Sequence, residues 1–428
     1  MKKNRVVITG LGVVTPLGVG IGATFDALVE KRSGITRITA FDAGRFHSQI
    51  GGEVKGAGVK DCIPKGYRKA GKVMARDIEL AVTAAYHAVK DAGLKTKCLV
   101  DRGEVPGPSD VDSTRFGANI GAGLICADLD ELAGALASSV DRPEAAEDRG
   151  FSFAKWGSEG MNNLTPLWLL KFLPNMLACH VTIVHDCQAP SNTITCGEAS
   201  SHLAVGEAFR IIARGDADIC ICGGAESKIN PMSLVRQGLM GRLVPGGDED
   251  PAEACRPFDV ARRGMVVSEG GGLMILEELE HAKRRGARIY GEVLGFGAAS
   301  SAKHWLRPDP DGRSQALAMT KALADAGVTP DGVGLVNAFG IAMKEHDLSE
   351  AAAIRQVFGA NGRTVPVLAT KGAIGNNGAG SGAIDLAVTT MALNRGVVPP
   401  SLNTEQVDPA CGLNVVRGDP IDCRADCA

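Results

Sequence analysis

Hydrophobic residues follow two patterns along the chain, continuous runs and helical repeats. Four runs are mostly apolar or glycine, as expected of strands buried on both faces: residues 6–14, 116–123, 217–222 and 270–279. Segments 75–92 and 199–214 instead carry apolar side chains every three or four residues, which predicts amphipathic helices. Buried strands that alternate with such helices predict an α/β fold in which helices cover the sheets.

The second part of the chain repeats this alternation with shorter elements. Strands are predicted at residues 287–297, 334–339, 365–370 and 414–417, and helices at residues 314–326, 347–356 and 383–394. Segment 95–114 is polar and contains glycine and proline, which predicts a surface loop, and segment 227–250 is predicted to be a helix followed by a glycine loop. We place the boundary between two halves at 254/255, giving 1–254 and 255–428.

Residues 190–227 carry the strongest local signal. β-Branched residues predict a short strand at 191–196, Gly197 permits a sharp turn, and helical spacing begins at Ala199. Glu198 is therefore predicted at the N-terminus of a helix, where backbone N–H groups and the helix dipole favour negative charge. Such an elbow suits a nucleophile, an oxyanion hole or a bound carboxylate.

Length and charge narrow the function classes. The 428 residues suit two domains or two fused halves better than one small core. Charged residues make up 22% of the chain and the formal net charge is −3, so neither nucleic acid nor a membrane surface is implied as a partner.

The first residues are basic, but glycines interrupt the apolar run that follows, so we predict a first strand and no signal peptide. No apolar run approaches the roughly 20 residues that span a bilayer. These observations favour a cytoplasmic location.

The twelve cysteines show no spacing typical of a disulfide framework. Cys220 and Cys222 are predicted on one face of a strand, and the nearest second pair, Cys423 and Cys427, lies at the end of the chain. We therefore expect reduced thiols and no metal site.

A Gly-x-Gly pair at 10–12 lacks the third glycine and the downstream acid of a dinucleotide loop, so we expect a tight turn and no cofactor.

Several motifs are distributed over nearly the whole chain. They are VVITGLGVVTPLG at 6–18, GANIGAGL at 117–124, NMLACHVTI at 175–183, GDADICICGGAES at 215–227, CRPFDVARRG at 255–264, VNAFG at 336–340 and TKGAIGNNGAGSG at 370–382. Together they resemble the β-ketoacyl-acyl-carrier-protein synthases, most closely the KAS II type. The resemblance implies a thiolase-like α/β fold with two similar halves, each with a five-stranded sheet, packed as α-β-α-β-α layers. No repeat between the halves is evident in the sequence itself.

The resemblance also implies three catalytic positions, and the chain departs from the family at each of them. The elbow cysteine of the family corresponds to Glu198, and its two histidines correspond to Phe339 and Asn376. The residues before and after the elbow fix this register. Cys196 falls two residues early, and we expect it to be a small buried residue of the strand.

At other positions that the resemblance places near the active site, the chain has the family's residue in some cases and a different residue in others. Lys371 and the acidic Glu350 are retained. The two threonines that contact pantetheine in the family are replaced by Ile341 and Met343. His304 matches a histidine near the rim of the family's active site, with a surface loop as the alternative interpretation. The family's late G-F-G-G loop, which helps to form the oxyanion hole, is absent from the sequence.

These replacements predict that the chain alone does not catalyse condensation. A carboxylate cannot hold an acyl group as a thiolate does, Phe339 has no hydrogen-bonding group, and Asn376 can donate a hydrogen bond but cannot shuttle a proton. We favour a role like that of the chain-length factors, which pair with an active ketosynthase and shape the acyl tunnel. The alternatives are a malonyl-carrier-protein decarboxylase, an active condensing enzyme that uses Cys196, and a product without function. An ionised Glu198 would repel the malonyl carboxylate, which argues against the decarboxylase.

The resemblance implies an acyl carrier protein as a partner, together with a second copy of the chain or an active ketosynthase. In the family, the variable region at 139–163 and the apolar segment at 165–177 lie at the dimer interface and line the acyl pocket of the neighbour. From the residues alone, an ordinary core is an equally good interpretation of segment 165–177.

Overall fold

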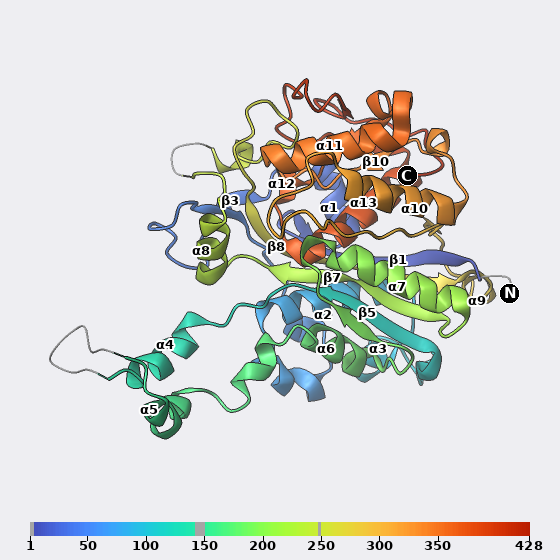
Figure 1. Cartoon of the computed structure of the whole chain (residues 1–428). Coiled ribbons are helices and arrows are strands. Elements are labelled where there is room, and N and C mark those ends of the chain that lie inside the picture. The colour runs from blue at the N-terminus through green and yellow to red at the C-terminus, as the bar shows by residue number, and fades with distance from the viewer. Residues whose placement is uncertain (1–3, 142–149, 247–249) are drawn as a thin grey trace.

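The structure is a computed structural model that describes residues 4–141, 150–246 and 250–428. Residues 142–149, within the variable region at 139–163, and residues 247–249, within the predicted glycine loop, lie outside the described part. The described chain forms a larger and a smaller sheet with helices outside and between them (Figure 1).

The larger sheet has nine strands, and the elbow follows its strand β6. Its strands are β1 (Val6–Thr15), β2 (Gly18–Val19), β3 (Ile35–Arg37), β4 (Ile50–Gly52), β5 (Phe116–Ala122), β6 (Asn192–Ile194), β7 (Ile219–Ser227), β8 (Val267–Glu278) and β9 (Gly291–Glu292). The main path runs β2-β1-β8-β7-β5-β6. β8 is antiparallel to both β1 and β7, whereas β5 is parallel to β7 and β6. Every residue of β1, β5 and β7 is buried, which explains their continuous apolar runs.

The smaller sheet contains three parallel strands in the order β10 (Val336–Asn337), β11 (Pro366–Leu368) and β13 (Asn414–Val415). β12 (Val397–Val398) and β14 (Ile421–Asp422) form a separate antiparallel pair. The prediction of two five-stranded sheets is therefore wrong in its strand counts. Part of the reason is segment 287–297, which pairs with β1 only around β9. Beyond β9, Gly295 and Gly297 pack directly on a helix backbone, so the segment leaves the predicted strand.

Helices form three layers around the two sheets. The helices are α1 (Ile21–Val29), α2 (Arg76–Asp91), α3 (Lys97–Asp101), α4 (Leu129–Ser138), α5 (Phe153–Ser158), α6 (Met176–His185), α7 (Ser200–Arg214), α8 (Pro231–Leu239), α9 (Leu279–Arg284), α10 (Arg313–Ala326), α11 (Lys344–Phe358), α12 (Lys371–Ile374) and α13 (Ser381–Arg395). α2 and α6 cover the outer face of the larger sheet, α7 and α13 lie between the sheets, and α10 and α11 cover the smaller sheet (Figure 1). The order is therefore α-β-α-β-α, as the resemblance implies.

The two halves share a local design that the sequence does not reveal. In the first half, β6 leads to a 3₁₀ turn at Gly197–Ala199, and the 15-residue helix α7 follows. In the second half, a 3₁₀ turn at Gly378–Gly380 precedes the 15-residue helix α13. Both helices end at a glycine in the left-handed conformation. The halves thus present two equivalent helix N-termini toward the middle of the molecule.

Two sequence predictions need correction or comment. Segment 95–114 is not only a loop, because Cys98 and Leu99 are buried in the short helix α3.

β8 begins after the proposed boundary at 254/255, yet it pairs with β1 and β7 in the larger sheet. The larger sheet therefore includes chain from both sides of that boundary, and the boundary itself stays a prediction.

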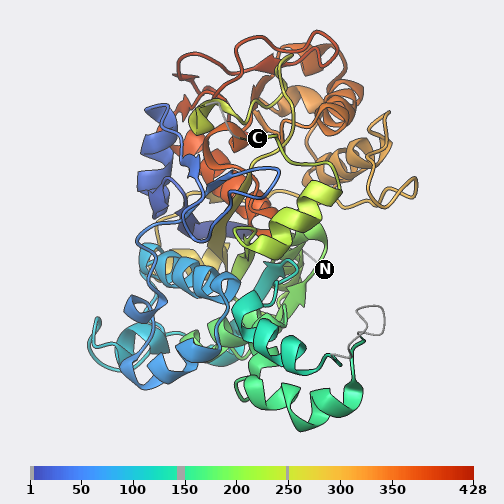
Figure 2. The ribbon, with the colours of Figure 1, turned by 90° about the vertical axis from the view of Figure 1, so that its left-hand side faces the viewer.

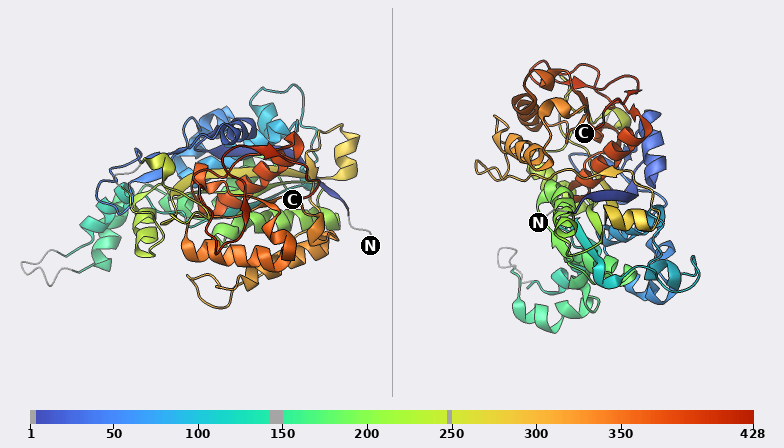
Figure 3. Two further views of the ribbon diagram at one scale, coloured as in Figure 1. Left: turned by 90° about the horizontal axis from the view of Figure 1, so that it is seen from above. Right: turned by 90° about the vertical axis from the view of Figure 1, so that its right-hand side faces the viewer.

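Helices α4 and α5 project away from the layered body (Figures 1 and 3). From the side they lie at the base of the molecule, far from the C-terminal half (Figure 2). Large apolar side chains are exposed there, including Phe153 at 84% and Leu167 at 68%. Exposed apolar side chains that gather in one region mark a surface that a partner can cover.

Within the described ranges, no helix is both long and apolar enough to cross a membrane.

Candidate active site around Glu198

Glu198 lies on the 3₁₀ turn between β6 and α7, close to its predicted place. Gly197 before it has a φ of 56°, the left-handed conformation that favours glycine, so the chain can turn sharply. The carboxylate of Glu198 accepts a hydrogen bond from Arg242, with 2.7 Å between Nη2 and Oε1. The elbow therefore presents an ion pair in place of a free nucleophile.

The charge of Glu198 follows from its surroundings. Burial by itself would raise the pKa of the Glu198 carboxyl, but the positive charges of Arg242 and Lys228, together with the hydrogen bond from Arg242, lower the pKa to about 2. Glu198 is therefore ionised at neutral pH, as the sequence analysis expects of a helix N-terminus.

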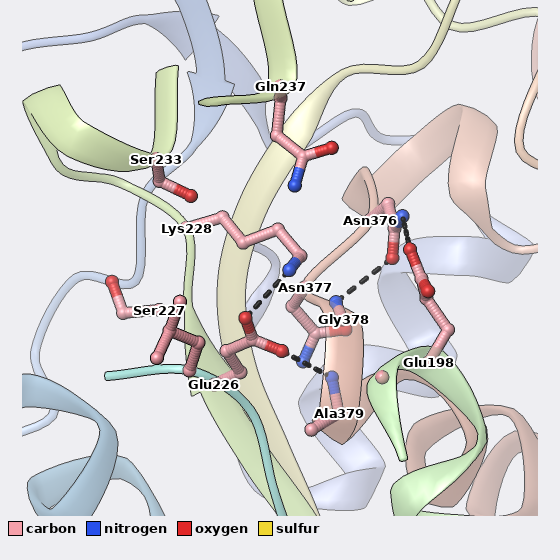
Figure 4. Close-up of polar contacts among 12 residues, drawn as sticks. Glu198, Glu226, Ser227, Lys228, Ser233, Gln237, Asn376, Asn377, Gly378 and Ala379 are labelled. Atoms are coloured by element: carbon pink, nitrogen blue, oxygen red, sulfur yellow. Dashed lines mark hydrogen bonds and ion pairs between the residues drawn. The ribbon is translucent and has the colours of Figure 1, made fainter. Parts of the chain in front are cut away.

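Asn376 faces Glu198 from the second half of the chain (Figure 4). The side-chain oxygen of Asn376 accepts hydrogen bonds from the Gly378 N–H at 2.9 Å and the Ser381 hydroxyl at 3.1 Å. This arrangement directs Nδ2 toward Glu198 Oε1, 3.4 Å away, and toward Met265 Sδ at 3.3 Å. The amide can donate a weak hydrogen bond to the elbow, but it has no group that exchanges a proton near neutral pH.

Phe339 lies in an apolar cluster that also contains Ile341, Met343 and Met265. The polar contacts at Phe339 come from the backbone and not from its side chain. The N–H groups of Phe339 and Gly340 donate to the carboxylate of Glu350 at 2.7 and 2.9 Å. Burial raises the pKa of Glu350, and these two backbone donors offset part of that effect. The side chain at this position offers neither a donor nor an acceptor to a reacting group.

Lys371 is completely buried and forms an ion pair with Asp385. Its ammonium also donates to the Thr370 hydroxyl at 3.2 Å and lies 5.5 Å from the centre of the Phe339 ring. The charge of Lys371 is thus compensated inside the second half of the chain.

The three remaining predicted positions lie apart from this centre. Ile341 is only 1% exposed and belongs to the core. Met343 lines a cavity on the far side of Arg242. His304 is exposed on the loop after β9, where its Nδ1 accepts hydrogen bonds from the N–H groups of Leu306 and Arg307 at 3.0 and 3.1 Å. The structure therefore brings Glu198 and Asn376 together but does not place His304 beside them.

Two cavities share Arg242 as a wall. One, of about 430 Å³, adjoins Glu198 and is also lined by Glu226, Lys228, Arg236 and Gln237; we call it the elbow cavity. The other, of about 380 Å³, is lined by Arg262, Arg307, Met343, Lys344 and His346; we call it the outer cavity. Both are rich in charged side chains, in contrast to the apolar cluster around Phe339.

Several charged residues of this site are not among the residues predicted from the sequence. Lys228 is buried and donates to Glu226 Oε1 at 2.6 Å, while Glu226 Oε2 accepts from the Ala379 N–H at 2.7 Å (Figure 4). His346, in the first turn of α11, lies near the ion pair: burial lowers its pKa, Arg242 lowers it further, and Glu198 opposes both. Glu226 and Lys228 could have been predicted as site residues from the sequence, because they lie at the end of the buried strand β7 beside the elbow.

Cys196 is not the buried strand residue that we expect from the sequence. It is exposed, because β6 ends at Ile194 and Cys196 lies in the turn beyond the sheet. Its N–H donates to the Ser200 hydroxyl at 2.8 Å, and its side chain is not among the described residues that line the elbow cavity. The site therefore offers ionic groups and amide donors at the elbow, with no thiol facing the elbow cavity.

Throughout the described part of the chain, no group of three or more His, Cys, Asp or Glu residues is placed to hold a metal ion.

Comparison with known proteins gives matches along the whole chain. The family model of the β-ketoacyl synthase N-terminal domain matches residues 3–282, and that of the C-terminal domain matches residues 290–405. A 3-oxoacyl-[acyl-carrier-protein] synthase 2 from Synechocystis sp. is 35% identical over 419 residues, which cover 98% of this chain and 92% of the relative. The tetracenomycin polyketide synthase ketoacyl synthase alpha subunit from Streptomyces glaucescens is 33% identical and covers 99% and 93% of the two chains.

Solved structures agree with these matches. The structure described as the ishigamide ketosynthase/chain length factor superposes with a TM-score of 0.81 at 27% identity, covering 99% of this chain and 94% of the other. A type II PKS acyl-carrier protein in complex with its ketosynthase, described as AntDE:AntF, gives a TM-score of 0.78 at 27% identity, covering 98% and 94%. These similarities confirm the predicted thiolase-like fold.

Proposed function

The chain belongs to the β-ketoacyl synthase family, and we propose that within this family it acts as a non-condensing partner of an active ketosynthase. The observation that carries the proposal is the ion pair of Glu198 with Arg242 at the position of the family's elbow cysteine. A carboxylate with a pKa of about 2 cannot form the acyl thioester that condensation requires.

The two positions that correspond to the family's histidines support the same proposal. Phe339 supplies no polar side-chain atom, and Asn376 supplies one amide whose oxygen is already occupied by Gly378 and Ser381. Loss of a single oxyanion donor typically costs about 10²–10³ in rate, and here both histidines and the thiol are replaced together. An enzyme with this set of residues has no thiol at Glu198 to carry the acyl chain, and neither Phe339 nor Asn376 is a histidine that could stabilise the enolate.

A partner subunit has a suitable surface to bind. β6, directly before the elbow, is the last strand on the main path of the larger sheet, and an edge strand is a template for pairing with another chain. Nearby, the projecting region of α4 and α5 exposes Phe151, Phe153, Met161, Leu167 and Leu169. A partner that covers this region would remove a large apolar area from water.

The same proposal includes an acyl carrier protein as the molecule that delivers the chain. Two similar structures support it, because one contains a ketosynthase with an acyl-carrier protein and the other a ketosynthase with a chain length factor. In this proposal the active subunit performs the chemistry, and the present chain contributes the surface beside the growing product.

The test combines mass analysis with co-purification. Malonyl- and acyl-carrier protein incubated with this protein alone should keep their intact masses. Co-expression with a ketosynthase that retains the cysteine and both histidines should give a stable complex of one copy of each. A β-ketoacyl product from the chain alone would overturn the non-condensing role, and failure to form the complex would overturn the partner role.

Malonyl decarboxylation is a second candidate, favoured by the Asn376 amide that points toward the elbow. The ionised Glu198 argues against it through repulsion of the malonyl carboxylate, although Arg242 compensates part of that charge. The same mass assay separates the candidates, because a decarboxylase converts malonyl-carrier protein to acetyl-carrier protein. In that case the Asn376→Ala variant should lose the conversion.

A further inference from the structure

We infer that a cavity beside the smaller sheet binds an extended segment of a separate polypeptide as an added β-strand, an interaction that the partner role does not assign. The cavity has a volume of about 520 Å³ and lies between two stretches of the chain, 290–295 and 425–428. α10 lines it from one side and α13 from the other, and Figure 1 shows both helices beside the C-terminus. We call this cavity the strand slot.

The first wall of the strand slot packs on its helix as β1 does. The glycines at 10 and 12 in β1 lie against the backbone of α2, and those at 295 and 297 lie against the backbone of α10. β1 also has β8 as a neighbouring strand. In contrast, the backbone N–H and C=O groups of Leu294 and Gly295 form no hydrogen bond with any residue that the structure describes. This wall therefore has its helix contact but lacks a strand on one edge.

The second wall has the alternation of a strand. Cys423, Ala425 and Cys427 are partly buried, and the residues between them are exposed. The carbonyl of Cys427 accepts a hydrogen bond at 3.0 Å from the N–H of Gly334, which precedes β10. The N–H groups of Ala425 and Asp426 have no acceptor within the described ranges. Unpaired backbone groups along an edge are a template for another strand.

The larger sheet shows what fills the corresponding place. There β8 lies between β1 and β7 and is antiparallel to both. No described strand lies between the two walls of the strand slot. The covering helix reflects this difference, because only Ala316 is buried along the 14 residues of α10, whereas α2 is buried along most of its length. A strand in the slot would cover α10 and pair with both walls.

The lining of the slot selects the chemistry of the added strand. The helices contribute small, apolar or hydroxyl side chains: Ala322, Leu323 and Ala326 from α10, and Leu386, Thr389, Thr390 and Leu393 from α13. The charged side chains in the lining are Glu292, which already pairs with Arg5, and Asp426. A strand with helices on both faces is apolar at successive positions. The ligand is therefore an uncharged, apolar segment of another protein.

The experiment is a fluorescence-polarisation titration of a labelled synthetic peptide with the whole protein. The peptide has the sequence of β8 at 270–276 with two added lysines at each end for solubility, because β8 fills the corresponding place in the larger sheet. We expect saturable binding of one peptide per chain. A matched peptide with proline in place of the central leucine lacks one backbone donor and should bind at least about 10-fold more weakly.

Two variants of the protein test the first wall. Leu294→Pro removes an N–H group that has no partner in the described structure, and it should weaken peptide binding about 10-fold or more. Leu294→Ala is the matched control: it removes the same side chain, which is 42% exposed, but keeps the N–H group, so the affinity should stay within about threefold.

Hydrogen exchange of the wild-type protein with bound peptide locates the site independently of these variants. We expect the peptide to slow exchange at 290–297 and 424–428. The inference is overturned if no saturable binding occurs up to about 100 μM peptide, if the proline peptide binds equally well, if both variants weaken binding equally, or if protection falls on β6. Protection of 290–297 that rises with protein concentration in the absence of peptide would show that a second copy fills the slot, and this too would overturn the inference.

Discussion

Arg242 holds Glu198 in a fixed ion pair, with 2.7 Å between the guanidinium Nη2 and the carboxylate Oε1. The same arginine reaches Gln237 with Nη1 and lines both cavities of the site. Glu198 is therefore part of a connected set of side chains, since its negative charge has a partner already in place.

This ion pair makes stability depend on pH in a defined window. The pKa of Glu198 is lowered from 4.5 to about 2 in the folded protein, so its contribution is present above pH 4.5 and is lost as the pH falls toward 2. Relative to wild type, Glu198→Gln should cost about 1–3 kcal/mol of unfolding free energy at pH 7. That difference should shrink below pH 4.5. Urea unfolding of both proteins at several pH values measures it.

A matched control uses the exposed pair Lys31–Asp419. Asp419→Asn should change the unfolding free energy by less than about 1 kcal/mol at every pH, because surface ion pairs contribute little. An equal cost for both variants would contradict a special role for the Glu198–Arg242 pair.

A thiol placed at the elbow should not by itself be enough for condensation. In Glu198→Cys, Phe339 and Asn376 remain and supply no imidazole to the thiol, and we expect no β-ketoacyl product above background. Adding Phe339→His and Asn376→His should raise the rate of product formation by at least about 10²-fold over the single variant. Intact-mass analysis of the carrier protein measures both. Comparable turnover by the single variant would show that another group of this chain can serve in place of both histidines.

The layered architecture could be predicted because burial on both faces leaves continuous apolar runs. β1, β5 and β7 are buried at every residue, and each lies within or close to its predicted range. Segment 287–297 has the same kind of sequence, but its backbone packs on α10 at Gly295 and Gly297. The pattern of apolar residues within a segment does not reveal such long-range contacts. For this reason the sequence predicts too many strands for the smaller sheet.

The site could be predicted only where a motif fixes the register. Glu198 and Asn376 are named by their place in motifs, and the structure brings them within 3.4 Å. Arg242, Arg236 and Gln237 come from α8 and the segment after it, whose sequence gives no sign that it faces the elbow. Their role depends on the cluster in which Leu234 of α8 packs against Leu243 and Val267, which is a tertiary property.

The buried pair of Lys371 and Asp385 should dominate the stability of the second half. Lys371→Met leaves a buried carboxylate without a counter-charge and should cost about 3–5 kcal/mol. The double variant Lys371→Met/Asp385→Asn removes the charge as well and should be more stable than the single variant. Urea unfolding of the four proteins forms a double-mutant cycle. If the double variant loses the sum of both single effects, the two residues are not coupled.

The projecting region of α4 and α5 should decide whether the protein associates. Phe153 is 84% exposed there and packs edge-on against Phe151 with 5.2 Å between ring centres. Phe153→Asp should weaken the complex with an active ketosynthase about 10-fold or more, because it places a charge where a partner would bury an aromatic ring. Trp305→Asp is the matched control: Trp305 is also 84% exposed, but it lies on the loop after β9. Sedimentation velocity on mixtures with the ketosynthase measures the affinity of each variant. If Trp305→Asp weakens the complex more than Phe153→Asp, the partner covers the loop after β9 and the interface proposed for α4 and α5 is wrong.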